Sequence, residues 1–195
     1  DAGATHAVLE VSSHALDQRR CDGLSFAVAV FTNLTGDHLD YHQTLERYAG
    51  AKRRLFGLLE NGGVAVINAD DPWAELMISA FSGRVIRFGL DSPVAEIRAE
   101  QVRPSALGTQ FIVRGPGFRL PVECGLVGLH NVRNVMAAVA SAMALGLTFD
   151  EIAAGVAGLV AAPGRLERVE PPGTPFSVFV DYAHSDDALT NVLSA

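Results

Sequence analysis

The stretch that decides the fold runs from residue 31 to residue 59 and reads FTNLTGDHLDYHQTLERYAGAKRRLFGLL. A polar loop with two histidines comes first. A segment follows in which apolar residues recur at steps of three and four, namely Leu45, Tyr48, Ala49, Leu55, Phe56 and Leu59. That spacing is typical of a helix with one face turned to a core, so we predict a helix over residues 45–59.

Lys52 falls on the same apolar stripe and is the one lysine among the fifteen basic residues of the chain. A guanidinium stays charged, whereas a desolvated ammonium can lose its proton and become a nucleophile or be covalently modified. The alternative is a lysine whose stem follows the core edge and whose head reaches solvent beside Arg53 and Arg54. The preference for arginine elsewhere favours a chemical role for Lys52.

Short apolar runs alternate with predicted helices on both sides of this stretch, and polar residues follow several of the runs. The expected strands are 5–11, 26–31, 64–67 and 84–88, with a helix over 73–81. Strands that alternate with helices predict a parallel α/β sheet flanked by helices, in which ligands bind outside the carboxyl ends of the strands.

The second half of the chain predicts a small antiparallel sheet region and two helices. Alternating segments at 96–102, 109–113 and 118–122, separated by glycine and proline, favour hairpins. An apolar stripe predicts a helix over 131–145, and a capping box from Thr148 to Glu151 opens another helix that ends near Val160. A linker with Pro171-Pro172-Gly173 leads to a strand at 176–180, so we expect one domain over 1–170 and the start of a second over 171–195.

Composition excludes several classes of protein. The net charge is −7, and no basic cluster extends beyond Arg53 and Arg54, which argues against a nucleic-acid surface. The longest small-apolar run, 135–147, is too short to cross a bilayer. Cys21 and Cys124 indicate neither a disulfide framework nor a zinc site, so we expect a cytoplasmic protein without membrane insertion. Nothing in the sequence indicates the oligomeric state.

A candidate metal site follows the first two expected strands. Glu10, His38 and the loop carboxylates Asp37 and Asp40 would converge if these strands were neighbours, and oxygen ligands with an imidazole suit magnesium or manganese. His38 and His42 have the spacing of HExxH, but no glutamate follows His38 and the pair is expected in a loop, which disfavours zinc. Each residue alone fits an ordinary surface loop.

A candidate nucleotide site follows from four polar residues further along. Asn131 and Asn134 either cap a helix or bind a base or ribose. Arg165, after Pro163-Gly164, either binds a phosphate or is solvated. Asp181, which ends a strand, either holds a ribose hydroxyl or fixes a neighbouring loop.

The blocks that contain these residues resemble the Mur ligases, and most closely the MurE type, which adds the third residue of the peptidoglycan stem peptide. The matching blocks are Glu10 to Leu16, Phe31 to Leu34 with Asp37 to His42, Ala51-Lys52, Asn68 to Asp71, His130 to Val132 with Asn134, Pro163 to Glu167 and Asp181 to His184. The resemblance implies most of a central ATP-binding domain and an ATP-dependent amide ligase that forms an acyl phosphate. ATP and Mg²⁺ are its implied cofactors, and UDP-muramoyl-peptide and an amino acid are its implied substrates.

The same resemblance implies roles for individual residues. Lys52 matches the lysine that carbon dioxide converts to a carbamate, which with Glu10 and His38 holds magnesium. The implied substrate contacts are Ser12, Gln18 and Arg20. The implied nucleotide contacts are Asn131, Asn134, Arg165 and Asp181, with Tyr182 and His184 alongside.

Three departures from the family pattern accompany the resemblance. No GxxxxGK[ST] phosphate loop occurs in these residues, so we expect it before Asp1, and the chain alone would not be a working ligase. Ser185-Asp186-Asp187 and Gly36 also differ from the common pattern. The alternatives are another ligase of the superfamily, of the folylpolyglutamate synthase or cyanophycin synthetase type, and a non-catalytic nucleotide-binding module.

Overall fold

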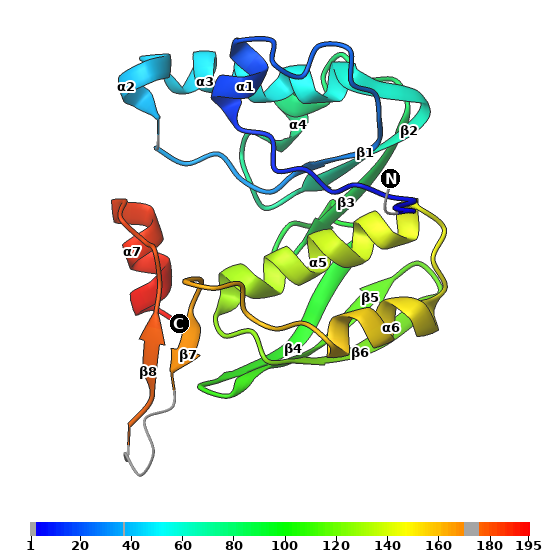
Figure 1. Cartoon of the computed structure of the whole chain (residues 1–195). Helices are drawn as coiled ribbons and strands as arrows, with labels where there is room; N and C mark the ends of the chain where they lie inside the picture. Colours follow the sequence, from blue (N-terminus) through cyan, green and yellow to red (C-terminus); the bar gives the residue numbers. More distant parts are fainter. Residues whose placement is uncertain (1–2, 37, 170–175) are drawn as a thin grey trace.

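A six-stranded sheet organises the molecule, whose computed structural model describes residues 3–36, 38–169 and 176–195 (Figure 1). The strands follow one another across the sheet in chain order: β1 Phe26–Phe31, β2 Leu59–Asn68, β3 Arg84–Gly89, β4 Ile97–Ser105, β5 Gly108–Gly115 and β6 Phe118–Cys124. The first four strands are parallel, and β4, β5 and β6 pair antiparallel. The predicted α/β fold is confirmed, and the predicted hairpins extend the parallel sheet.

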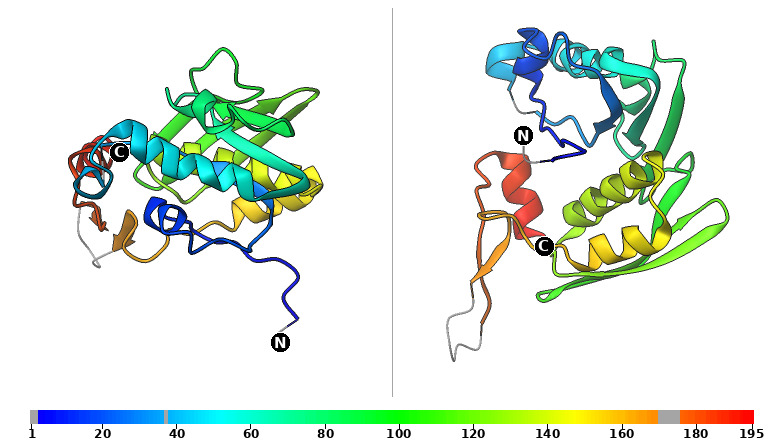
Figure 2. Two further views of the ribbon diagram at one scale, coloured as in Figure 1. Left: turned by 90° about the horizontal axis from the view of Figure 1, so that it is seen from above. Right: turned by 45° about the vertical axis from the view of Figure 1, so that its right-hand side comes forward.

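Helices cover both faces of this sheet (Figures 1 and 2). The layer at the top of Figure 1 contains α1 Ser13–Asp17, α2 Leu39–His42, α3 Leu45–Arg53 and α4 Ala74–Met77. The opposite face carries α5 Leu129–Ala144 and α6 Phe149–Ala157. The sheet is therefore the middle layer of three.

The central strand β2 is buried on both sides, as a parallel strand between two helical layers must be. Ala65 and Ile67 belong to the apolar cluster that includes α3 and α4, and both are 0% exposed. Val64 and Val66 belong to the cluster that includes α5 and α6. The alternation of side chains along β2 thus divides the core into two clusters, and the carboxyl end of the strand opens onto polar residues.

The helix predicted over 45–59 is present in two parts. The α-helix α3 ends at Arg53, a 3-10 helix runs over Arg54–Leu58, and Leu59 already belongs to β2. Leu59 pairs with Phe26, and the register shifts before Val28 pairs with Val64. The strand predicted over 64–67 therefore begins earlier, at Leu59, and residues 61–63 lie inside β2. The helix expected over 73–81 is shorter than predicted and is α4.

The prediction of a strand over residues 5–11 is wrong. Residues 3–12 have no regular secondary structure, and Val8 is 99% exposed. An apolar run becomes a strand only when a neighbour accepts and donates its backbone hydrogen bonds. Within the described part of the chain β1 pairs only with β2, so the run 5–11 does not pair along the other edge of β1.

The last part of the chain folds back toward the sheet edge. β7 Glu167–Val169 and β8 Val178–Val180 pair antiparallel, and α7 Asp186–Leu193 follows them. The strand expected over 176–180 is confirmed in its second half, and β7 was not predicted. The backbone N–H of Tyr182 donates to the carbonyl of Gly164 at 2.9 Å, which joins the end of β8 to the segment before β7. In the residues that the structure describes, no helix has the length and apolar character needed to cross a membrane.

Candidate functional site

An open cleft of about 760 Å³ lies at the carboxyl ends of the parallel strands. Its walls come from the residues after β1 and β2, Phe88 near the end of β3, the first turn of α5, the segment 160–165, the residue after β8, and α7. This is the sheet edge at which open α/β folds bind ligands. Four of the predicted nucleotide contacts line it together: Asn131, Asn134, Arg165 and Asp181.

The floor of the cleft is fixed by side chains that follow β2. The amide of Asn68, which is 4% exposed, donates to the carbonyl of Thr32 at 2.7 Å. The carboxylate of Asp71 accepts the backbone N–H groups of Leu34 and Trp73, both at 2.8 Å. These bonds hold the loop after β1 against the loop after β2, so both present a defined surface to the cleft.

Asp70 lies between these two residues and binds a different loop. Its carboxylate accepts the backbone N–H groups of Leu90, Asp91 and Ser92 at 2.8, 3.0 and 2.9 Å. Its Oδ2 also lies 3.5 Å from Nε of Arg133. Burial by itself raises the pKa of Asp70, but the three N–H donors and the charge of Arg133 outweigh it and hold the pKa below its ordinary value. Asp70 is therefore an anion at neutral pH.

The predicted nucleotide residues carry structural bonds as well. The amide of Asn131 donates to the carbonyl of Val127 at 2.8 Å, and the amide of Asn134 donates to Oδ1 of Asn131 at 3.2 Å. Asp181 accepts the backbone N–H groups of Leu166 and Ala183, both at 2.7 Å. These side chains thus fix the neighbouring backbone, as the structural interpretation expected, and they also line the cleft in which a nucleotide could bind.

Tyr182 and His184 lie beside the cleft and are not among the residues that line it. The guanidinium carbon of Arg165 lies 5.9 Å from the centre of the Tyr182 ring, and the Tyr182 and His184 rings are 5.0 Å apart. Tyr182 is 70% exposed. These three residues form a rim in which an aromatic surface orients Arg165.

Lys52 is half-buried near one end of the cleft. Its Nζ donates to the carbonyl of Asn33 at 2.7 Å and lies 5.0 Å from the centre of the Tyr48 ring. The ring of His38 meets the same Tyr48 ring edge-on at 5.8 Å. Asn33 and Tyr48 both line the cleft, so Lys52 and His38 each contact a residue at its edge.

The structure does not gather the other predicted metal ligands. Glu10 is exposed in the irregular segment 3–12, because the strand that would carry it to the sheet edge does not form. Asp40 is exposed on α2, and Asp37 lies outside the described residues. Among residues 3–36, 38–169 and 176–195, no three His, Cys, Asp or Glu side chains are grouped so that they could hold a metal ion.

The three predicted substrate contacts lie on or near α1. Ser12 caps that helix by accepting the N–H of Ala15 at 3.2 Å. The amide of Gln18 approaches the hydroxyl of Tyr41 at 3.5 Å, and that hydroxyl donates to Asp17 at 3.1 Å. Arg20 is exposed in the turn after α1. Ser12 and Gln18 therefore flank one short helix, which is tied to α2.

His42 was expected in a loop and instead ends the short helix α2, where it is 5% exposed. Its Nε2 hydrogen-bonds Oγ of Ser13 at 2.9 Å, and its ring stacks on Tyr48 with the centres 5.0 Å apart. Burial, and after it the nearby His14, lower the pKa of His42. His42 thus joins α1, α2 and α3 as a neutral core side chain, and it is no ligand in this arrangement.

Comparisons with known proteins show the family to which the chain belongs. The pattern of the Mur ligase middle domain matches residues 1–142. The chain belongs to the Mur ligase family. The UDP-N-acetylmuramoyl-L-alanyl-D-glutamate--2,6-diaminopimelate ligase of Geobacter metallireducens is 47% identical over 199 residues, which are 99% of this chain and 39% of the relative.

Solved structures show the same relationship. The structure of a ligase with the same name matches this Mur ligase chain with a TM-score of 0.83 and 38% identity, over 98% of this chain and 39% of that one. A mutant of L. casei FPGS matches with a TM-score of 0.68 and 21% identity, over 87% and 42% of the two chains, and shares the fold alone. The chain spans about 39% of the length of the diaminopimelate ligases that it matches.

Two charged or titratable residues that line the cleft, His130 and Arg133, were not among the sequence candidates. His130 lines the cleft, and burial lowers its pKa, with Asp181 acting in the opposite direction and Arg133 in the same one. Arg133 lines the cleft next to Asp70. The signal that could have found His130 is its place in the His-Asn-Val block, whereas the partner of Arg133 lies 63 positions earlier in the sequence.

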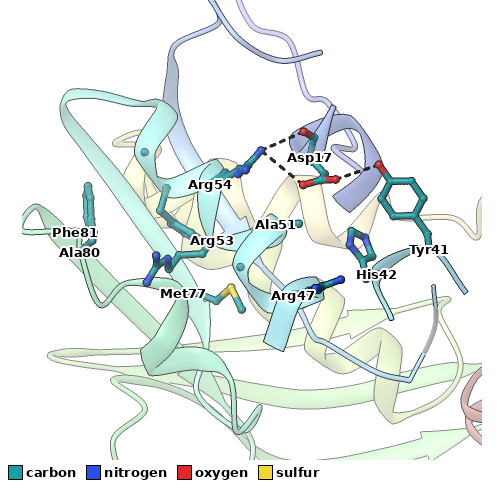
Figure 3. Close-up of a pocket in the computed structure, with 13 residues that line it drawn as sticks. Asp17, Tyr41, His42, Arg47, Ala51, Arg53, Arg54, Met77, Ala80 and Phe81 are labelled. Atoms are coloured by element: carbon teal, nitrogen blue, oxygen red, sulfur yellow. Dashed lines mark hydrogen bonds and ion pairs between the residues drawn. The ribbon is translucent and has the colours of Figure 1, made fainter. Parts of the chain in front are cut away.

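A second cavity of about 660 Å³ lies on the outer side of the α1–α3–α4 layer and contains three arginines (Figure 3). These arginines are already paired. Arg54 lies 3.7 Å from Asp17, Arg53 donates to Ser79 at 3.2 Å, and Arg47 donates to Gln43. The arginines that line this cavity therefore have structural contacts, and the Arg54–Asp17 pair joins α1 to the end of α3.

Proposed function

We propose that this chain is the central part of an ATP-dependent ligase that adds the third amino acid to UDP-N-acetylmuramoyl-dipeptide in the cytoplasm. The observation that carries the proposal is the cleft, where Asn131, Asn134, Arg165 and Asp181 meet from three segments far apart in sequence. Residues 1–170 would form the ATP-binding domain, and 171–195 would begin the next one. The relatives are named for 2,6-diaminopimelate, which makes it the first amino acid to test.

The reaction transfers the γ-phosphoryl group of ATP to the terminal carboxylate of the substrate. The amine of the incoming amino acid then attacks the acyl phosphate, and phosphate leaves. Such chemistry depends mainly on positioning and on the neutralisation of charge on oxygen. In this chain Asn131 and Asn134 would contact the base or ribose, Asp181 a ribose hydroxyl, and Arg165 a phosphate, with Tyr182 and His184 at the rim.

The other end of the cleft would carry the acceptor. Ser12, Gln18 and Arg20 would contact the UDP-muramoyl substrate from α1 and its flanks. Lys52 and His38, which share contact with Tyr48, would hold magnesium with Glu10, once Lys52 has become a carbamate. The metal would neutralise phosphate oxygens. The contacts of Lys52 and of His38 with the same Tyr48 ring support this assignment, which requires the segment with Glu10 to approach them.

The test uses the full-length protein that contains this chain. Purified enzyme with UDP-N-acetylmuramoyl-L-alanyl-D-glutamate, ATP and diaminopimelate should release phosphate and form the tripeptide. No phosphate should be released when folate replaces the UDP-muramoyl dipeptide. Asp181→Asn should lower the rate by about 10²-fold, since it removes a charged ligand contact. Asp91→Asn, on an exposed loop, is the matched control and should leave the rate unchanged.

Two outcomes would contradict the proposal. Turnover with folate and glutamate, and none with the muramoyl substrate, would place the protein with the folylpolyglutamate synthase type. Nucleotide binding without any ligase product would leave a non-catalytic module. The 47% identity to a diaminopimelate ligase, against 21% to L. casei FPGS, favours the muramoyl substrate.

A further inference from the structure

Asp70 is the most strongly bound side chain on the floor of the cleft. Its carboxylate receives three consecutive backbone N–H groups, from Leu90 to Ser92, and its side chain is 11% exposed. The backbone of Asp70 is fixed as well, because its N–H donates to Oδ1 of Asn68 at 3.1 Å. Asp70 therefore fastens the loop after β3 to the end of β2.

The Asp70 carboxylate lies so close to Gly89 that a side chain at that position would collide with it. A Cβ atom at Gly89 would lie 2.6 Å from Oδ1 and 3.2 Å from Cγ of Asp70. Because three amides hold the carboxylate, it has little freedom to move aside. The three amides and Gly89 thus fix the Asp70 side chain, and its Oδ2 lies 3.5 Å from Nε of Arg133.

Arg133 has one side-chain partner in the described part of the chain, which is Asp70. That contact uses Nε, so the two terminal nitrogens of the guanidinium have no partner among the described residues. The side chain is 34% exposed and lines the cleft on the same helical turn as Asn131 and Asn134. A planar guanidinium that pairs with a carboxylate through Nε keeps both terminal nitrogens as donors, and these two are what bidentate recognition of phosphate uses.

We infer that Arg133 is a further nucleotide contact that binds a phosphate group, and that Asp70 is the positioning residue that orients it. This inference rests on the proposed function of the cleft. It assigns a second cation to the nucleotide site, on α5, in addition to Arg165. The arginines of the outer cavity differ in this respect, since their terminal nitrogens already bind Asp17, Ser79 and Gln43.

The experiment measures the affinity of the full-length protein for ADP, AMP and adenosine by isothermal titration calorimetry. Arg133→Met keeps the aliphatic stem and removes the charge. We expect about tenfold weaker ADP binding, because a charge-assisted hydrogen bond is lost, and less than about threefold weaker adenosine binding. Arg103→Met, at an exposed position of β4 outside the cleft, is the matched control and should bind ADP as the parent does.

Asp70→Asn tests the positioning role. If Asp70 acts on the nucleotide through Arg133, this variant loses ADP affinity, and the double variant Asp70→Asn/Arg133→Met is no weaker than Arg133→Met alone. A purely structural Asp70 would give additive losses. Asp70→Asn should also raise the KM for ATP more than it lowers kcat, and the KM for the amino acid should not change.

The outcomes separate the two proposals. ADP binding by Arg133→Met that equals the parent's overturns the role of Arg133, and equal losses for ADP and adenosine overturn the assignment to phosphate. Additive losses overturn the role of Asp70. A parent protein that binds none of the three ligands overturns the proposed function itself and this inference with it.

Discussion

Exchanging Lys52 and its neighbour is the sharpest test of the candidate site. Lys52→Arg keeps a positive charge but cannot become a carbamate. The double variant Lys52→Arg/Arg53→Lys keeps the composition of the chain and moves its one lysine to an exposed position. In the full-length enzyme we expect both variants to lose ligase activity while they remain folded.

The magnitudes follow from the contacts of Lys52. Its Nζ makes a charge-assisted hydrogen bond to the Asn33 carbonyl at 2.7 Å and lies 5.0 Å from the centre of the Tyr48 ring. Such a bond contributes about 1.5–3 kcal/mol and a cation–π contact about 0.5–1 kcal/mol, both less at a half-exposed site. Arginine can replace part of both, so the free energy of unfolding should fall by about 1 kcal/mol. The loss of an electrostatic group at the reacting phosphate should lower kcat by about 10²–10³-fold.

The assay combines thermal unfolding, phosphate release and intact mass. The parent protein, prepared gently in bicarbonate, should carry the mass of one added carbon dioxide, and both variants should lack it. Lys52→Ala should regain part of its activity when a short carboxylate such as acetate is added, and Arg53→Lys alone should behave as the parent. If Lys52→Arg is as active as the parent, the role assigned to Lys52 is wrong.

Three further predictions concern stability. Burial and His14 lower the pKa of His42 in the folded protein, so the unfolded chain binds the His42 proton more tightly. The contribution of neutral His42 to the free energy of unfolding is therefore present above the ordinary histidine pKa of about 6.5 and is lost as the pH falls below it. His42→Gln should flatten this pH dependence in urea titrations at about pH 5–8. Thr148→Ala removes the cap of α6 and should lower the Tm by about 2–4 °C, whereas Thr148→Ser should not. Gly89→Ala places a Cβ atom 2.6 Å from Oδ1 of Asp70 and should lower both the Tm and ADP affinity; a Tm equal to the parent's would show that Asp70 is free to move.

The sequence predicted the apolar strands of the parallel sheet, and it failed for a run whose strand formation depends on pairing. The runs that became β1, β2 and β3 are apolar enough to be buried on two faces, and their local pattern was sufficient. The run 5–11 has the same pattern, but strand formation depends on a pairing edge that sequence spacing does not contain. The hairpins were predicted correctly, yet only the pairing of β4 with β3 shows that they continue the main sheet.

The residues of the candidate site also fall into those that the local sequence indicated and those that only a long-range contact reveals. Asn131 and Asn134 were candidates because they stand at the start of a predicted helix, in a block that resembles the family, and the structure places both in the cleft. Asp70 and Arg133 were missed as a pair because their contact joins the end of β2 to the start of α5. A lone arginine among asparagines on a helix carries no local signal of an acidic partner.

Tyr48 shows why the two ends of the cleft depend on one core. Its ring is 5% exposed, stacks on His42, meets His38 edge-on and lies 5.0 Å from the ammonium of Lys52. It also lines the cleft that holds Asn131 and Arg133. The packing that fastens α2 to α3 therefore also sets the distance between the lysine and the nucleotide residues. Since phosphoryl transfer is governed by positioning, in the proposed reaction the rings of His38, His42 and Tyr48 would help to set the geometry, although none of them needs to exchange a proton.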